Sequence, residues 1–138
     1  MPLSSFNTIA IALDFSKNDQ ILLAHAMRLA QPETTLVMIH IVESASAKIF
    51  GHESDDLETR KDQEMLNAYA TQVQQRGFNA ETVLGFRNRT KEIPRLVKEA
   101  NADLLIIGSH GHKGVKDWLY GETINTVRHQ LHIPVLIV

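Results

Sequence analysis

A glycine-rich stretch from Gly108 to Gly121 contains the residue types and spacing that could do chemistry. It follows a short apolar run, Leu104–Ile107, and leads into a segment whose apolar residues have helical spacing. A strand that ends in glycines and is followed by a helix presents unpaired backbone N–H groups, which suit an anion such as phosphate. The stretch therefore predicts a phosphate or nucleotide site. The alternative is that the glycines only permit a tight turn between the strand and the helix.

Glu122 follows the last of these glycines and suits an anion site least. In the first turn of a helix its carboxylate is favoured by the helix dipole, typically by about 0.3–1 kcal/mol. The same carboxylate would repel a phosphate, since like charges about 4 Å apart cost on the order of 4 kcal/mol at an effective dielectric near 20. Mg²⁺, or Lys113 with a neutralising histidine, would have to offset that repulsion. We expect a helix-start acid that reduces ATP affinity.

Several cationic or titratable side chains lie in the stretch or follow the third expected strand: His110, His112, Lys113, Arg87 and Arg89. They could bring positive charge to a phosphate, or form a solvated rim without a fixed partner. His110, His112 and Glu122 could also suggest a metal site. Metal sites usually show a full ligand set with supporting outer groups, so we expect no metal here.

No catalytic constellation can be argued from the spacing of residues. The chain has no nucleophile elbow and no Walker A lysine pattern. His40 lies within an apolar run and is expected to be a buried, hydrogen-bonded histidine rather than a catalyst. We therefore do not expect an enzyme, or at most one with weak ATP hydrolysis.

Apolar runs and helical spacings alternate along the whole chain. Expected strands cover residues 8–13, 35–42, 80–84, 103–107 and 134–138. Expected helices cover about 17–30 with Ser16 as cap, about 55–76 with Gly77 as the stop, a segment capped by Thr90 with Pro94 in its first turn, and about 121–131.

This alternation predicts an α/β fold with a parallel sheet, right-handed crossovers and helices against the sheet. Ligands of such sheets bind at the carboxyl ends of strands, where the strand order reverses. Asp14 ends the first strand and Gly108 ends the fourth, so we expect them to be neighbours. Asp14 is then either a ligand-binding carboxylate or only a helix-start residue.

Length and composition exclude several classes of protein. A chain of 138 residues is long enough for one domain and short for two, so we expect a single domain over residues 1–138. The formal net charge of −2 does not favour binding to nucleic acid. The absence of cysteine fits the reducing cytoplasm. No apolar run is long enough to cross a membrane, and the N-terminus does not resemble a signal peptide.

The chain resembles the universal stress protein family along nearly its whole length. Five segments carry the resemblance: Ile9–Ser16, Ile39–Val42, Ala102–Gly111, Gly121 with the segment after it, and Pro134–Val138. The spacing of Gly108, Gly111 and Gly121 is similar to the ATP-binding pattern of the family.

The resemblance implies a doubly wound five-stranded sheet of order 3-2-1-4-5, often paired as a homodimer through strand 134–138. In the ATP-binding branch, a carboxylate at Asp14 lies near adenine and ribose, backbone at Ile41 reads the adenine edge, and the glycines surround ribose and phosphates. Glu122 departs from the usual Ser or Thr after the third glycine, which bears on triphosphate binding more than on adenosine binding. The site expected by this resemblance consists of Ala12, Asp14, Ile41, Ile107, Gly108, His110, Gly111, Gly121, Glu122 and Thr123.

The sequence thus predicts a sensor or regulatory module that binds an adenine nucleotide such as ATP or AMP, with or without Mg²⁺. The alternative is an interaction or regulatory domain that does not bind nucleotide, either as a free protein or as part of a larger protein such as a transporter. In either case we expect no membrane insertion, although association with a membrane protein would be compatible with the alternative.

Overall fold

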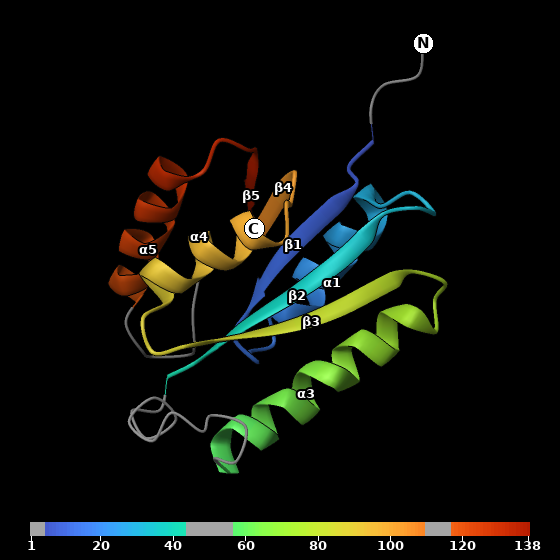
Figure 1. The fold of residues 1–138 in the computed structure, drawn as a ribbon, viewed down its shortest axis with the longest axis horizontal. Helices are drawn as coiled ribbons and strands as arrows, with labels where there is room; N and C mark the ends of the chain where they lie inside the picture. The colour runs from blue at the N-terminus through green and yellow to red at the C-terminus, as the bar shows by residue number, and fades with distance from the viewer. Residues whose placement is uncertain (1–4, 44–56, 110–116) are drawn as a thin grey trace.

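The structure, a computed structural model, describes residues 5–43, 57–109 and 117–138. Five parallel strands form one sheet in the order β3-β2-β1-β4-β5 (Figure 1). The strands are β1 (Thr8–Leu13), β2 (Thr35–Val42), β3 (Asn79–Phe86), β4 (Leu104–Ile107) and β5 (Val135–Ile137). The helices are α1 (Asp19–Leu29), α3 (Leu57–Gln74), α4 (Arg89–Glu99) and α5 (Asp117–Gln130). The expected fold class and strand order are confirmed.

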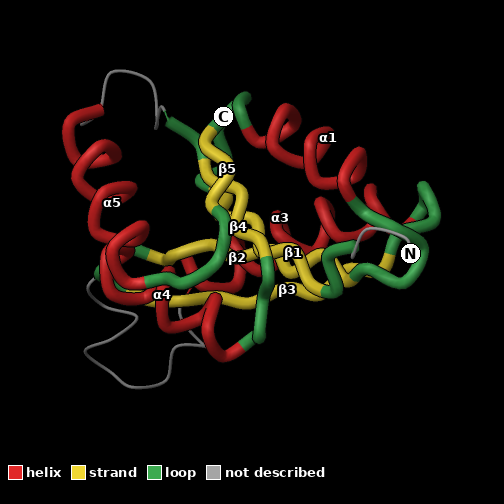
Figure 2. The backbone as a smooth tube through the Cα atoms, turned by 90° about the horizontal axis from the view of Figure 1, so that it is seen from above, coloured by secondary structure: helices red, strands yellow, loops and turns green. Residues whose placement is uncertain are grey.

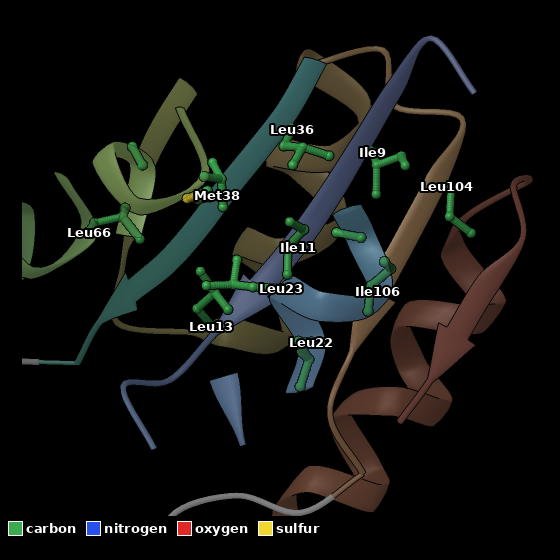
Figure 3. Close-up of a cluster of buried hydrophobic side chains, with 13 residues drawn as sticks. Ile9, Ile11, Leu13, Leu22, Leu23, Leu36, Met38, Leu66, Leu104 and Ile106 are labelled. Atoms are coloured by element: carbon green, nitrogen blue, oxygen red, sulfur yellow. The ribbon is translucent and has the colours of Figure 1, made fainter. Parts of the chain in front are cut away.

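Each face of the sheet is covered by two helices, as the view from above shows (Figure 2). Side chains alternate between the two faces along a strand. Ile9, Ile11 and Leu13 of β1 pack with residues of α1 and α3, and Figure 3 shows Ile11 and Leu13 near Leu23 of α1. The intervening residues of β1 and its neighbours pack against α4 and α5 on the opposite face. Burial on both faces explains why β2 and β4 are almost uninterrupted apolar runs.

The register brings the carboxyl ends of three strands to one edge of the sheet. Ala12 of β1 is paired with Ile107 of β4, and Leu13 is paired with His40 of β2. Because β1 lies between β2 and β4, the strand order reverses beside β1. The expected proximity of Asp14 and Gly108, which follow the paired ends of β1 and β4, is confirmed.

Two expected helix caps are wrong. Helix α1 begins at Asp19 after Asn18, and Ser16 does not cap it, because the chain makes a turn at residues 14–16 before the helix begins. Helix α4 is capped by Asn88, whose side chain accepts a hydrogen bond from the Lys91 N–H, so Thr90 is already inside the helix. This earlier start places Pro94 in the second turn rather than the first, at a position that cannot donate to the Thr90 carbonyl.

The end of α3 agrees with the sequence prediction, whereas the start of α5 does not. Gly77 follows α3 with a φ of 92°, and it terminates the helix as expected. Helix α5 begins at Asp117, earlier than the expected start near residue 121, so Gly121 is inside the helix. Glu122 therefore lies in the second turn and not in the first, where the helix dipole would favour it most. Within the described residues, no helix combines the length and the apolar character needed to cross a membrane.

Candidate functional site at the carboxyl edge of the sheet

Three residues of the expected site lie near the carboxyl ends of the central strands and belong to the same face of the sheet. Ala12, Ile41 and Ile107 all pack in the hydrophobic cluster that α4 and α5 cover. Ile41 is 6% exposed and Ile107 is 1% exposed, so their side chains are part of the core next to this edge of the sheet. A ligand at such an edge would contact the backbone groups that follow these residues.

Gly108 continues from β4 and is buried. The next residue, Ser109, is fixed by two hydrogen bonds to the Val138 carbonyl, from its backbone N–H at 2.7 Å and from its hydroxyl at 3.0 Å. The start of the glycine-rich stretch is thus tied to the end of β5. His110 and Gly111 lie outside the described residues.

Asp14 is half-buried at the end of β1 and begins a tight turn. Its carboxylate accepts a hydrogen bond from the Ser16 N–H at 3.0 Å. Phe15, the middle residue of this turn, has a φ of 65°. That backbone conformation is rare for a bulky residue and costs of the order of 1–3 kcal/mol, so the surroundings must enforce it.

Ser16 has an unusual environment for a hydroxyl group. Its Oγ is buried and has no hydrogen-bond partner among the residues that the structure describes. A buried hydroxyl without a partner is costly, and such groups often meet a water or a ligand. Ser16 is two residues from Asp14 and belongs to the same turn at this edge of the sheet.

Asp19 holds the turn from the side of α1. Its carboxylate accepts hydrogen bonds from the N–H of Asp14 at 3.2 Å and of Phe15 at 2.7 Å, and from the hydroxyl of Tyr69 at 2.9 Å. Burial, reinforced by the charge of Asp14, raises the pKa of Asp19 to about 6, although the donated hydrogen bonds act in the opposite direction. Burial and the two carboxylates also raise the pKa of Tyr69, which therefore remains a hydrogen-bond donor.

His40 holds the same turn from the side of β2. Its Nδ1 is 2.9 Å from the Leu13 carbonyl and its Nε2 is 3.1 Å from the Asp62 carboxylate of α3, while its ring stacks on Phe15 with 3.8 Å between ring centroids. The two polar contacts and the stacking together fix the orientation of the His40 ring. The prediction of a buried, hydrogen-bonded histidine is confirmed.

Gly85 of β3 sets the position of Ile41. The two residues are register partners, and a Cβ atom at position 85 would lie 2.7 Å from Ile41 Cδ1 and 2.9 Å from Leu96 Cδ1. A side chain there would displace both. The absence of a side chain at position 85 thus lets α4 pack closely behind the strand that carries Ile41.

The last three residues of the expected site lie on α5 and differ in exposure. Gly121 and Glu122 are exposed, whereas Thr123 is only 3% exposed and its hydroxyl lies 3.5 Å from that of Thr90 on α4. Thr123 therefore contributes to the packing of α5 on α4. Within the described ranges, no three histidine, aspartate or glutamate side chains are grouped so as to hold a metal ion.

Comparison with known proteins identifies the fold and its family. The model of the universal stress protein family matches residues 5–138. The chain belongs to the universal stress protein family. A curated member, the universal stress protein YxiE of Bacillus subtilis, is 26% identical over 96% of this chain and 99% of its own length.

Solved structures of the family share the fold at low sequence identity. UspA from Lactobacillus plantarum superposes with a TM-score of 0.78 at 17% identity, covering 99% of both chains. A universal stress protein in complex with cAMP has a TM-score of 0.69 at 20% identity, covering 98% of both chains. The Archaeoglobus fulgidus protein in complex with dAMP has a TM-score of 0.67 at 18% identity, covering 94% of this chain and 95% of the other.

Sequence reasoning missed the residues that shape the turn after β1. Ser16 has the residue type of a helix cap, and Asp19 and Tyr69 lie on helices far apart in the sequence. The one local signal is the second acidic residue five positions after Asp14. Nothing in the spacing of Asp19 and Tyr69 indicates that they meet, because that contact depends on how α1 and α3 pack together.

Proposed function

We propose that this protein binds an adenine nucleotide at the carboxyl ends of β1, β2 and β4 and acts as a sensor or regulatory module. The observation that carries the proposal is the reversal of strand order beside β1, which brings Asp14 and Gly108 together at one edge. Relatives of the same fold in complex with cAMP and dAMP support the adenine nucleotide as the ligand class.

In this proposal the central strand ends receive the nucleoside. Asp14 accepts hydrogen bonds from the ribose hydroxyls, and backbone groups at Ile41 read the adenine edge. Ala12 and Ile107 provide apolar surface, and Gly108 lets the ligand approach the backbone. The buried hydroxyl of Ser16, which has no hydrogen-bond partner in the described part of the chain, fits a polar ligand near Asp14.

The phosphates would extend toward His110, Gly111, Gly121, Glu122 and Thr123. The exposed Glu122 disfavours a triphosphate at this end unless a cation such as Mg²⁺ accompanies it. Adenosine and AMP are therefore expected to lose less affinity from this residue than ATP. Ligand binding would change the surface that contacts a partner molecule in the cytoplasm. This change would report to the partner that nucleotide is bound.

Calorimetric titration tests the proposal directly. The protein is titrated with ATP, ADP, AMP, cAMP and adenosine, with and without Mg²⁺. We expect binding of at least one adenine compound in the micromolar to millimolar range and a weaker site in Asp14→Ala. Absence of binding for every compound at millimolar concentration would refute the proposed function.

A second candidate is an interaction module whose nucleotide site has decayed, and the exposed carboxylate of Glu122 favours it. The variant Glu122→Ser separates the two candidates, with Glu122→Asp as a control that keeps the charge. If the parent protein binds no ATP and Glu122→Ser binds it, the interaction module is correct. If the parent already binds ATP, we expect Glu122→Ser to tighten ATP binding by about two- to fivefold and to leave adenosine binding unchanged, since one exposed charge contributes up to about 1 kcal/mol.

A further inference from the structure

The turn that carries Asp14 is held by contacts that the nucleotide itself does not make. Asp14 follows the last residue of β1, and Phe15 after it has the left-handed backbone with a φ of 65°. A glycine would adopt this conformation without strain, whereas phenylalanine requires its neighbours to hold it there. Those neighbours are the stacked ring of His40 and the carboxylate of Asp19.

Asp19 is placed to fix the backbone of this turn rather than to stabilise its own helix. Its side chain is 1% exposed, and both carboxylate oxygens point back to the turn, where Oδ1 accepts from Asp14 N–H and Oδ2 accepts from Phe15 N–H. Tyr69 on α3 donates a third hydrogen bond to Oδ2. One buried carboxylate thus connects the end of β1 with two helices.

We propose that Asp19 is a positioning residue of the nucleotide site, and that its ionised carboxylate holds Asp14 in the orientation that binds the ligand. This inference rests on the proposed function. Hydrogen bonds to an ionised carboxylate are roughly twice as strong as those to a neutral acceptor, so uptake of a proton by Asp19 loosens the turn. Ligand binding is then coupled to the charge of a residue that the ligand does not touch.

The charge of Asp19 changes in a useful range of pH. Burial first, and then the charge of Asp14, raise the pKa of Asp19 to about 6, while the hydrogen bonds from Tyr69 and the turn lower it. Among the described residues, two further titratable groups lie near the turn: His40 of β2, which stacks on Phe15, and Asp62 of α3, which contacts His40. These groups remain in a variant of Asp19 alone, so the contribution of Asp19 can be isolated.

Asp103 provides a matched control at the opposite end of the same strand. Its carboxylate accepts hydrogen bonds from the N–H groups of Asn7 at 2.8 Å and Thr8 at 3.0 Å, where β1 begins. Asp19 and Asp103 thus make the same type of contact with the backbone at the two ends of β1. Only Asp19 lies at the edge that carries Asp14.

The experiment measures adenosine affinity by calorimetry at about pH 5 and about pH 7.5. Adenosine is the probe because it has no phosphate, so its own charge does not change over this range. We expect the wild-type dissociation constant to rise by about three- to tenfold at the lower pH, the upper value applying if the protonated form does not bind. We expect Asp19→Asn to bind adenosine weakly at both pH values, with a ratio of the two dissociation constants near one. We expect Asp103→Asn to keep the wild-type ratio of dissociation constants.

A second variant keeps the test decisive if Asp19→Asn does not fold. Tyr69→Phe removes a hydrogen bond that lowers the pKa of Asp19, so the midpoint of the affinity change should move to higher pH. If Asp19→Asn or Tyr69→Phe keeps the wild-type pH profile and affinity, the positioning role of Asp19 is refuted. If the wild type binds no adenine compound at either pH, the proposed function itself fails.

Discussion

Single carboxylates secure both ends of β1 by accepting hydrogen bonds from backbone N–H groups. Asp103 binds the N–H groups at the start of the strand, and Asp19 binds those of the turn that follows it. Asp19 is the more deeply buried of the two, with 1% exposure. Burial of a charge has a consequence for stability that can be measured without any ligand.

The stability of the fold should respond to the ionisation of Asp19. Its pKa rises from 3.8 to about 6 on folding, so between about pH 4 and pH 6 the folded state binds more protons than the unfolded state. By linkage this contribution to the unfolding free energy falls as pH rises through that range and stays constant above it, with a total change of up to about 3 kcal/mol.

Urea denaturation of the wild type and of Asp19→Asn, at about pH 4.5 and about pH 7, measures this contribution. The difference between the two proteins should shift in favour of Asp19→Asn at the higher pH. An unchanged difference between the two pH values would show that Asp19 has the same pKa in the folded and unfolded states.

At the scale of elements, the positions of the helix starts depend on contacts that are distant in sequence or on competing caps. Asn88 and Thr90 are both good N-cap residue types, and only the observed hydrogen bond from Lys91 N–H decides between them. The Thr90 hydroxyl instead lies near Thr123 at the contact between α4 and α5.

Two alanine substitutions distinguish these roles. Asn88→Ala removes the cap of α4 and should lower the unfolding free energy by about 1 kcal/mol. Thr90→Ala removes a hydroxyl with one long contact and should cost less than half as much. Thermal or urea unfolding of both variants provides the measurement, and a larger loss for Thr90→Ala would contradict the observed cap.

The strands could be predicted from the sequence more accurately than the helix ends. β1 and β2 were predicted with their exact bounds, because burial on both faces leaves continuous apolar runs that end at polar residues. The start of α5 could not be predicted, because Gly121 has the residue type of a loop but lies in the helix. For the site, the pairing of strand ends was predictable from the alternating pattern, whereas the contact of Asp19 with Tyr69 required the packing of α1 and α3.

At the scale of the whole molecule, β5 is an edge strand whose outer side is not paired within the described chain. Its last residue, Ile137, is 41% exposed, and the resemblance to the family led us to expect a homodimer through this strand. Val138 N–H bonds to the Ile107 carbonyl of β4, so the N–H of Ile137 points away from β4, to the outer side of the sheet.

Sedimentation equilibrium tests pairing of two chains along β5. We expect a species with twice the 15.5 kDa mass of one chain. Ile137→Pro removes the outward N–H and should shift the equilibrium to monomer, whereas Ile137→Thr keeps that N–H and should retain most of the dimer. A wild type that stays monomeric at high concentration would exclude this pairing.

The order of elements along the chain determines which face of the sheet is covered first during synthesis. The chain up to Phe86 contains β1, β2 and β3 with the two helices of one face, whereas both helices of the other face are translated later. Until α4 and α5 are synthesised, the apolar residues Ala10, Val37 and Ile39 lack the helices that bury them, and such exposed apolar surface is prone to aggregation. Pairing of β1 with β4 requires the chain up to Ile107, so the edge that carries Asp14 and Gly108 forms only after α4 has been synthesised.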